Sequence, residues 1–162
     1  GYPDANEERE ILKRTTGGGG AEVTSVVSAE ELKELQDTIR ELPVADAVFD
    51  YALGLARATR VRAGEPLPFI RENVSWGAGP RASQFLILGA KAHAALAGRM
   101  HVAIEDVRAV AKPVLRHRIV TNFTAQAEGI TSDHLIDRLI EEIDPAQAVG
   151  AGLPGVRDQS AS

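Results

Sequence analysis

The 162-residue sequence contains no cysteine, which excludes disulfide bonds and thiolate metal ligands. Aromatic residues are also scarce, at 4% of the chain against 44% for all hydrophobic residues, so aliphatic side chains and alanine must fill the core. No apolar run approaches the roughly 20 residues needed to span a bilayer, and we expect no membrane partner. The start of the chain, Gly1–Pro3, has neither an initiator methionine nor the basic-then-apolar pattern of a signal peptide. We therefore expect an excised piece of a cytoplasmic protein.

Basic residues are fewer than acidic ones. The chain has 18 Lys and Arg residues and 23 Asp and Glu residues, which gives a formal net charge of −5. This balance argues against broad attraction to nucleic acid or to acidic membranes. The four histidines lie on separate segments without the spacing of metal ligands, so we expect no metal site and interpret them as surface or helix-end imidazoles. They are His93, His101, His117 and His134. A Gly-x-Ser-x-Gly elbow is also missing, and the chain by itself has no complete catalytic constellation.

A phosphate-cradling loop is absent as well. The run Gly17–Gly20 is rich enough in glycine, but a Walker-type loop needs Lys-Ser or Lys-Thr directly afterwards, and Ala21–Glu22 follows instead. We interpret Thr15–Val27 as a flexible linker. The preceding segment, Pro3–Arg14, has acidic residues early and basic residues late, which predicts a short charged helix.

From residue 28 to residue 143 the apolar spacing predicts an all-α domain, a small helical bundle of about five helices. Ser28 and Glu31 form a capping-box pattern at the start of the first bundle helix, which Pro43 ends. A second helix is expected over about residues 45–62. The inward positions of these two helices are Leu32, Leu35, Ile39 and Leu42, then Val48, Tyr51, Ala52 and Leu55.

The third helix, Ala82–Leu96, is apolar most of the way round, which predicts a place at the centre of the bundle, and Gly98 is a plausible stop. A fourth helix is expected from Ile104 to about Arg118, kinked or split at Pro113. Inward positions there are Val107, Ala111, Val114 and Leu115.

The segment Ile119–Phe123 is expected to be extended, and Thr131 caps a last helix whose apolar stripe ends at Ile143. That stripe consists of Leu135, Ile136, Leu139, Ile140 and Ile143. Gly64–Pro68 is interpreted as a surface loop. Residues 144–162 offer little to bury, and we expect a disordered tail.

Arg81 stands out chemically. The segment Val74–Ser83, with the sequence VSWGAGPRAS, brings this arginine to the first turn of the third helix. A helix N-terminus carries partial positive charge, so a cation there needs a compensating anion, which a phosphate would supply. Its planar fork of donors suits a terminal phosphate. Alternatively, Arg81 extends into solvent or pairs with a nearby carboxylate. We interpret Trp76 as a core anchor for the loop.

Two further basic groups end helices: Arg57, Arg60 and Arg62 on the second helix, and Arg116–Arg118 on the fourth. Compensation of the helix dipole explains both positions without a partner. The alternative is contact with an acidic surface on a neighbouring domain or subunit. Binding to nucleic acid is a weaker third reading, because the acidic total provides no favourable field.

Several ordered motifs together resemble the C-terminal lid of a MoxR-type AAA+ ATPase. They are SWGAGPRAS at Ser75–Ser83, EDVRAVA at Glu105–Ala111 and PVLRHR at Pro113–Arg118. The opening GYPD, with Glu7, Glu8, Ile11 and Leu12, resembles the stretch that closes the ATPase core of that family. The resemblance covers nearly everything from Gly1 to about Ile143.

The resemblance implies that Arg81 is the sensor 2 residue, which reads the γ-phosphate of ATP held, with Mg²⁺, mainly by the core. Residues 1–27 would be a remnant of the core–lid junction plus linker, and residues 28–143 the lid. The Walker A, Walker B and sensor 1 motifs belong to the core and are missing. We therefore expect the chain alone to hold no nucleotide and to hydrolyse no ATP.

The family works as ring oligomers, commonly hexamers, that act as chaperone-like remodellers. The resemblance implies that the partners are the protein's own AAA+ core, neighbouring subunits and a client complex that is assembled or activated. Insertion of metal cofactors and cooperation with a von Willebrand A-domain protein are features of the family. No nucleic-acid partner is expected.

One departure from the family pattern concerns the fourth helix. Family members usually have a Ser or Thr cap and a proline where Ala103 and Ile104 stand, so this helix is expected to begin less sharply. Two rival hypotheses remain: a free-standing helical adaptor that docks an acidic partner through Arg116 and Arg118, and a DNA-binding helical domain.

Overall fold

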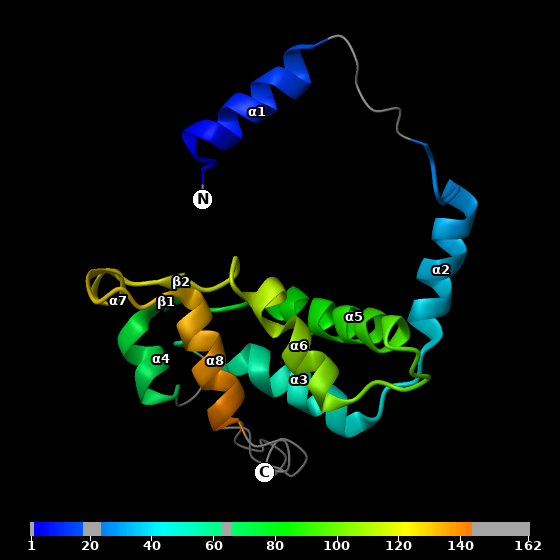
Figure 1. The fold of residues 1–162 in the computed structure, drawn as a ribbon. Coiled ribbons are helices and arrows are strands. Elements are labelled where there is room, and N and C mark those ends of the chain that lie inside the picture. The colour runs from blue at the N-terminus through cyan, green and yellow to red at the C-terminus, as the bar shows by residue number, and fades with distance from the viewer. Residues whose placement is uncertain (1, 18–23, 63–65, 144–162) are drawn as a thin grey trace. The chain divides into compact units, whose positions relative to one another are not determined.

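The computed structural model describes residues 2–17, 24–62 and 66–143 (Figure 1). Within them lie eight helices and one two-stranded sheet, so the all-α prediction is confirmed, although it expected only about five helices. The helices are α1 (Ala5–Thr16), α2 (Ala29–Glu41), α3 (Asp46–Ala58), α4 (Pro68–Asn73), α5 (Pro80–Leu96), α6 (Ile104–Leu115), α7 (Phe123–Ala127) and α8 (Ser132–Glu142). The strands are β1 (Val74–Trp76) and β2 (Val120–Thr121).

The chain divides into two compact units, Gly1–Glu34 and Leu35–Ser162, which are described separately. The predicted tail 144–162, most of the glycine run and much of the Gly64–Pro68 loop fall outside the described residues, so those expectations stay predictions. Among the described residues, no helix is both long and apolar enough to cross a membrane.

The first unit contains α1, the predicted charged helix. Asp4 caps it reciprocally with Glu7: Asp4 Oδ1 accepts from the Glu7 amide at 2.9 Å, and Glu7 Oε2 accepts from the Asp4 amide at 2.9 Å. None of its side chains is buried.

Helix α2 begins with the predicted capping box. The Ser28 amide donates to Glu31 Oε2 at 2.8 Å, and the Glu31 amide donates to Ser28 Oγ at 3.1 Å. Of the predicted inward residues, Leu32 and Leu35 are 52% and 54% exposed, Ile39 is partly buried, and Leu42, just after the helix, is buried. The sequence pattern therefore predicted the helix correctly, but its burial correctly only at the C-terminal end.

The core of the second unit lies among α3, α5, α6 and α8. Helix α5 packs most extensively on α6 and also contacts α3, and α8 packs on α6 and α3. Figure 1 shows these helices together, with α4, β1, β2 and α7 at one end of the domain. The predicted inward residues of α3, α6 and α8 are buried or partly buried. They are Val48, Tyr51, Ala52, Leu55, Val107, Ala111, Val114, Leu115, Leu135, Ile136, Leu139, Ile140 and Ile143.

Helix α5 buries a narrower face than predicted. Its buried residues, Ala82, Leu86, Ala90 and Ala94, recur every four positions and are mostly small. Phe85 and Leu96 remain 45% and 89% exposed. Ile87 and Ala95 are partly buried against the core, so neighbours cover one side of the helix. An apolar surface round most of the helix therefore does not place it at the centre of the bundle.

Other boundaries differ from those predicted. Helix α3 ends at Ala58 rather than near residue 62, and α4 was not predicted although Phe69 and Ile70 on it are buried. Helix α6 passes through Pro113 as one helix and is not split there.

Helix α5 stops as expected at Gly98, whose φ of 70° suits glycine. The Arg99 amide donates to the Ala94 carbonyl and the Gly98 amide to the Ala95 carbonyl, both at 2.9 Å, which is the pattern of a Schellman motif. This turn directs the chain back towards α6.

A buried carboxylate that the sequence reading missed joins α5 to α6. Asp106 is 0% exposed and accepts hydrogen bonds from Arg99, from His93 Nδ1 at 2.6 Å and from the Ala103 amide at 2.8 Å. The Arg99 contact is bidentate, with Nη1 2.6 Å from Oδ2 and Nη2 on Oδ1. Since a carboxylate only accepts, Nδ1 of His93 carries the proton.

Asp106 also binds the residue that precedes α6. Ala103 is the N-cap and has no side-chain oxygen to accept from the first helical amides, but its own amide donates to the Asp106 carboxylate three residues later, and α6 begins at Ile104. The Arg99 hydrogen bonds hold the pKa of Asp106 well below its usual value. The helix therefore starts at the predicted residue in spite of the missing Ser or Thr.

We expect Asp106→Asn to destabilise the domain by about 3 kcal/mol, because it leaves the guanidinium of Arg99 beside a neutral group and removes a buried acceptor. Urea unfolding followed by circular dichroism measures this loss. The exposed neighbour Glu105 gives the control Glu105→Gln, for which we expect a change below about 0.5 kcal/mol. Equal losses in the two variants would contradict a special role for Asp106.

The ion pair of Asp106 with Arg99 also predicts how stability depends on pH. A carboxylate whose pKa is lowered on folding stabilises fully above its unfolded pKa, about 3.9, and progressively less as the pH falls below that value. The difference in unfolding free energy between the wild type and Asp106→Asn should therefore shrink below about pH 4. An equal difference at pH 5 and pH 3 would show that the carboxylate charge is not involved.

Candidate functional site

The loop Gly77–Gly79 connects β1 to α5 and carries the candidate residue Arg81 just beyond it. Pro80 occupies the first helical position, and Gly79 is the N-cap, extended at φ −78° and ψ 179° without a side-chain cap. Arg81 is therefore on the first turn of α5, as the sequence predicts.

The side chain of Arg81 is exposed, and no described residue forms a hydrogen bond or ion pair with it. Of the two alternatives to an anion ligand, pairing with a carboxylate is not found within the described part of the chain. Its guanidinium is available to a ligand or to another part of the protein.

The loop is fixed to the end of α3 through Ala78. The Ala78 amide donates to Thr59 Oγ1 at 2.8 Å, and Arg60 Nε donates to the Ala78 carbonyl at 2.8 Å. Thr59 Oγ1 also donates to the Ala56 carbonyl at 2.7 Å, and Thr59 is fully buried. Both backbone polar groups of Ala78 are thus satisfied by Thr59 and Arg60, the two residues that follow α3.

Gly77 makes this close approach possible. A Cβ atom at this position would lie 2.1 Å from the carbonyl oxygen of Thr59 and 2.8 Å from Arg60 Cα. Backbone atoms cannot move aside as the end of a flexible side chain can, so any larger residue must displace the loop.

The other end of the loop is fixed by the small sheet. Strand β1 pairs antiparallel with β2, with Val74 opposite Thr121 and Trp76 opposite Val120. The Asn122 amide donates to the Asn73 carbonyl at 2.9 Å, which ties the two segments together. The prediction of extended structure near Ile119–Phe123 is confirmed at β2.

Trp76 is not the core anchor that the sequence suggested, because its side chain is 64% exposed. Val74 on the same strand is buried and takes that role. The loop itself is anchored by hydrogen bonds and by the absence of a side chain at Gly77, neither of which needs an aromatic ring.

The basic group at the end of α3 does more than compensate a helix dipole. Burial, followed by the positive charge of Arg57, lowers the pKa of Arg60 from its usual value. Arg60 is therefore a partly desolvated cation that donates a hydrogen bond to the Gly77–Gly79 loop. Sequence reasoning grouped it with Arg57 and Arg62 and had no signal for its contact with Ala78.

The second basic group already has partners in the chain. Arg116 Nη2 lies 3.0 Å from Asp133 Oδ2 of α8. Arg118 lies over the ring of Phe85, 5.1 Å from its centroid, and donates to the Val114 carbonyl. Asp133 thus partly balances the charge of Arg116, and Arg118 is held against its own helix and Phe85, while the adaptor hypothesis stays a prediction.

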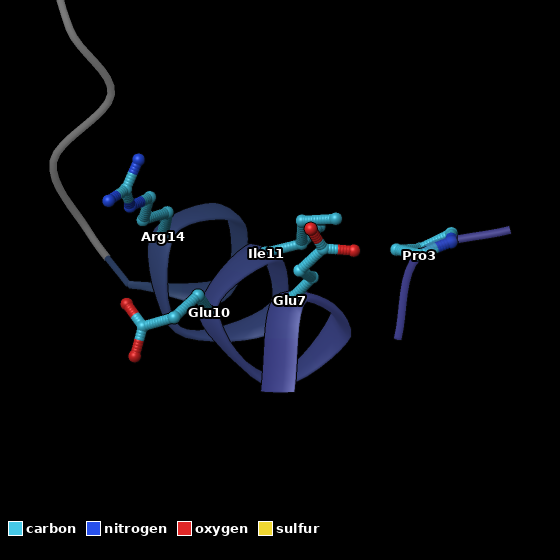
Figure 2. A pocket seen from close by; sticks show the side chains of 5 residues that line it. All are labelled: Pro3, Glu7, Glu10, Ile11 and Arg14. Atoms are coloured by element: carbon cyan, nitrogen blue, oxygen red, sulfur yellow. The ribbon is translucent and has the colours of Figure 1, made fainter. Parts of the chain in front are cut away.

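A separate open hollow of about 410 Å³ lies along α1 in the first unit (Figure 2). It is lined by Pro3, Glu7, Glu10, Ile11 and Arg14. Two carboxylates against one arginine make it a poor site for a phosphate. No group of three or more His, Asp or Glu side chains in the described ranges is arranged to hold a metal.

Comparisons with known proteins agree with the fold. Residues 69–139 match the AAA lid domain family. The crystal structure of a putative ATPase from Cytophaga hutchinsonii superposes with a TM-score of 0.73 at 30% identity, covering 89% of this chain and 44% of that one. The helical domain is therefore an AAA+ lid.

Its relatives define the family more narrowly. Chaperone MoxR1 of Mycobacterium tuberculosis is 31% identical over 167 residues, which cover all of this chain and 44% of that protein. The uncharacterized protein YeaC of Bacillus subtilis is 26% identical over 144 residues, covering 88% of this chain and 42% of YeaC. The chain belongs to the MoxR family of AAA+ proteins and spans less than half the length of these relatives.

We expect Gly77→Ala to destabilise the domain by about 1–3 kcal/mol, because the new methyl group overlaps the backbone of Thr59. The matched control is Gly79→Ala, since a Cβ atom there meets nothing within 4 Å. Thermal and urea unfolding of both variants measure the difference. A loss at Gly77 no larger than that at Gly79 would contradict the close-contact argument.

Proposed function

We propose that this chain is the nucleotide-sensing lid of a MoxR-family AAA+ ATPase, in which Arg81 acts as the sensor 2 residue. ATP and its Mg²⁺ would be held mainly by the ATPase core of the full-length protein. The observation that carries the proposal is an exposed arginine without a partner among the described residues, on a helix start whose loop is fixed at both ends.

The electrostatics of the position favour an anion. The first turn of α5 has no side-chain cap, and its backbone dipole adds positive charge beside that of Arg81. A phosphate oxygen would compensate both the helix dipole and the charge of Arg81. A guanidinium can also donate two parallel hydrogen bonds to a phosphate. The residues present therefore fit the terminal phosphate of a nucleotide, while none of the described clusters fits a metal.

In this proposal Arg81 does two things. Contact with the γ-phosphate draws the lid towards the core, and it stabilises negative charge that develops on the phosphate during transfer. Loss of the γ-phosphate after hydrolysis removes the contact and releases the lid. The chain without its core is expected to hydrolyse no ATP.

The wider setting is inferred from similarity. The relatives are more than twice as long as the segments matched here, which leaves room for an ATPase core, and one of them is named a chaperone. We propose a cytoplasmic ring, a hexamer by family precedent, that remodels a client complex. The first activity to test is insertion of a metal cofactor into the client complex. The first partner to test is a von Willebrand A-domain protein.

The test is Arg81→Ala in the full-length protein that carries this lid. Loss of charge-assisted hydrogen bonds worth about 1.5–3 kcal/mol should lower ATP turnover by about 10- to 150-fold. Arg81→Lys should keep part of the activity, because it retains the charge but not the planar fork. A coupled-enzyme assay of ATP hydrolysis measures turnover, and nucleotide titration measures affinity.

The control variant is Arg71→Ala, which removes an exposed arginine at the end of α4. It should leave both quantities unchanged. Unchanged turnover and nucleotide affinity in Arg81→Ala would overturn the sensor role.

A further inference from the structure

We propose that Thr59 and Arg60 are positioning residues for Arg81, acting through the Gly77–Gly79 loop. This inference rests on the proposed function of Arg81 and adds the residues that set its direction. Neither residue is part of the motif that suggested the function, and both lie about twenty positions earlier in the sequence, at the end of α3.

The contacts at Ala78 leave the loop little freedom. Its amide is held by a fully buried hydroxyl at 2.8 Å, and its carbonyl by the guanidinium of Arg60 at 2.8 Å. Thr59 Oγ1 is itself oriented by its donation to the carbonyl of Ala56 in the last turn of α3. The peptide groups on both sides of Ala78 are therefore oriented by the two residues that follow α3.

The backbone between Ala78 and Arg81 has few torsion angles that are free to rotate. Gly79 is extended, and the pyrrolidine ring of Pro80 restricts its φ to about −65°. The first turn of α5 has no capping side chain that would orient it independently. A shift of Ala78 therefore passes to the backbone of Arg81, and displacement of a catalytic group by about 1 Å can cost about 100-fold in rate.

The substitution Thr59→Val tests the hydroxyl, because it keeps the shape of the side chain and removes both hydrogen bonds. In the full-length protein we expect ATP turnover to fall by about tenfold. The matched control Thr59→Ser retains the oxygen and should stay within about twofold of the wild type. Unfolding midpoints measured in parallel report any loss of folded protein.

Arg60→Met provides a second, partly exposed position, so that the test survives if the buried Thr59→Val variant does not fold. It removes the hydrogen bond to the Ala78 carbonyl and keeps an unbranched apolar stem. A fall of about threefold to tenfold in turnover is expected. Arg71→Met on α4 is the control for loss of an arginine and should have no effect.

The decisive measurement is a double-mutant cycle with Arg81→Ala. If Thr59 and Arg60 act through Arg81, then Thr59→Val and Arg60→Met lower turnover in the wild type and have no further effect in the Arg81→Ala background. A merely structural role would lower turnover in both backgrounds and would follow the change in unfolding midpoint.

The outcomes separate the two proposals. If Arg81→Ala lowers turnover but the other variants act equally in both backgrounds, or have no effect, the positioning role is overturned and the sensor role stands. If Arg81→Ala leaves turnover and affinity unchanged, both proposals are overturned.

Discussion

One backbone contact, between Gly77 and the carbonyl group of Thr59, sets the geometry on which the candidate site depends. The loop contacts the backbone at the end of α3 because Gly77 has no Cβ atom that would overlap the Thr59 carbonyl. Only from that position can Ala78 reach both the hydroxyl of Thr59 and the guanidinium of Arg60. The start of α5, and with it the place of Arg81, follows from these contacts.

The C-terminal end of α5 is fixed by the hydrogen bonds and the ion pair of a buried carboxylate. Gly98 turns the chain through a Schellman motif, and the buried carboxylate of Asp106 then binds Arg99, His93 and the amide of Ala103, the residue before the next helix. Between the two ends, a stripe of small side chains lies against the core. Helix α5 is therefore fixed along its length, and a lid that closes on a nucleotide would move Arg81 together with the whole helical unit.

Sequence reasoning was most accurate where a local pattern has a single physical meaning. The capping box of Ser28 and Glu31, the stop at Gly98 and the cap at Thr131 all act within one turn of chain, and each is present. The predictions of burial were correct on α3, α6 and α8 and partly or wholly wrong elsewhere. The exposed Trp76 was expected in the core, and α5 was expected to be surrounded, because residue type predicts how apolar a surface is and not whether a neighbour covers it.

The sequence by itself determined the all-α class, most of the helix positions, the family resemblance and the location of Arg81 at a helix start. These properties depend on periodicity, on caps and on an ordered motif, all of which are local. Only the tertiary structure decided what surrounds that arginine. Asp106 meets Arg99 and His93, and Arg60 meets Ala78, through contacts between different elements. No spacing along the chain specifies such contacts, since they arise when helices pack and bring distant backbone and side-chain groups within hydrogen-bonding distance.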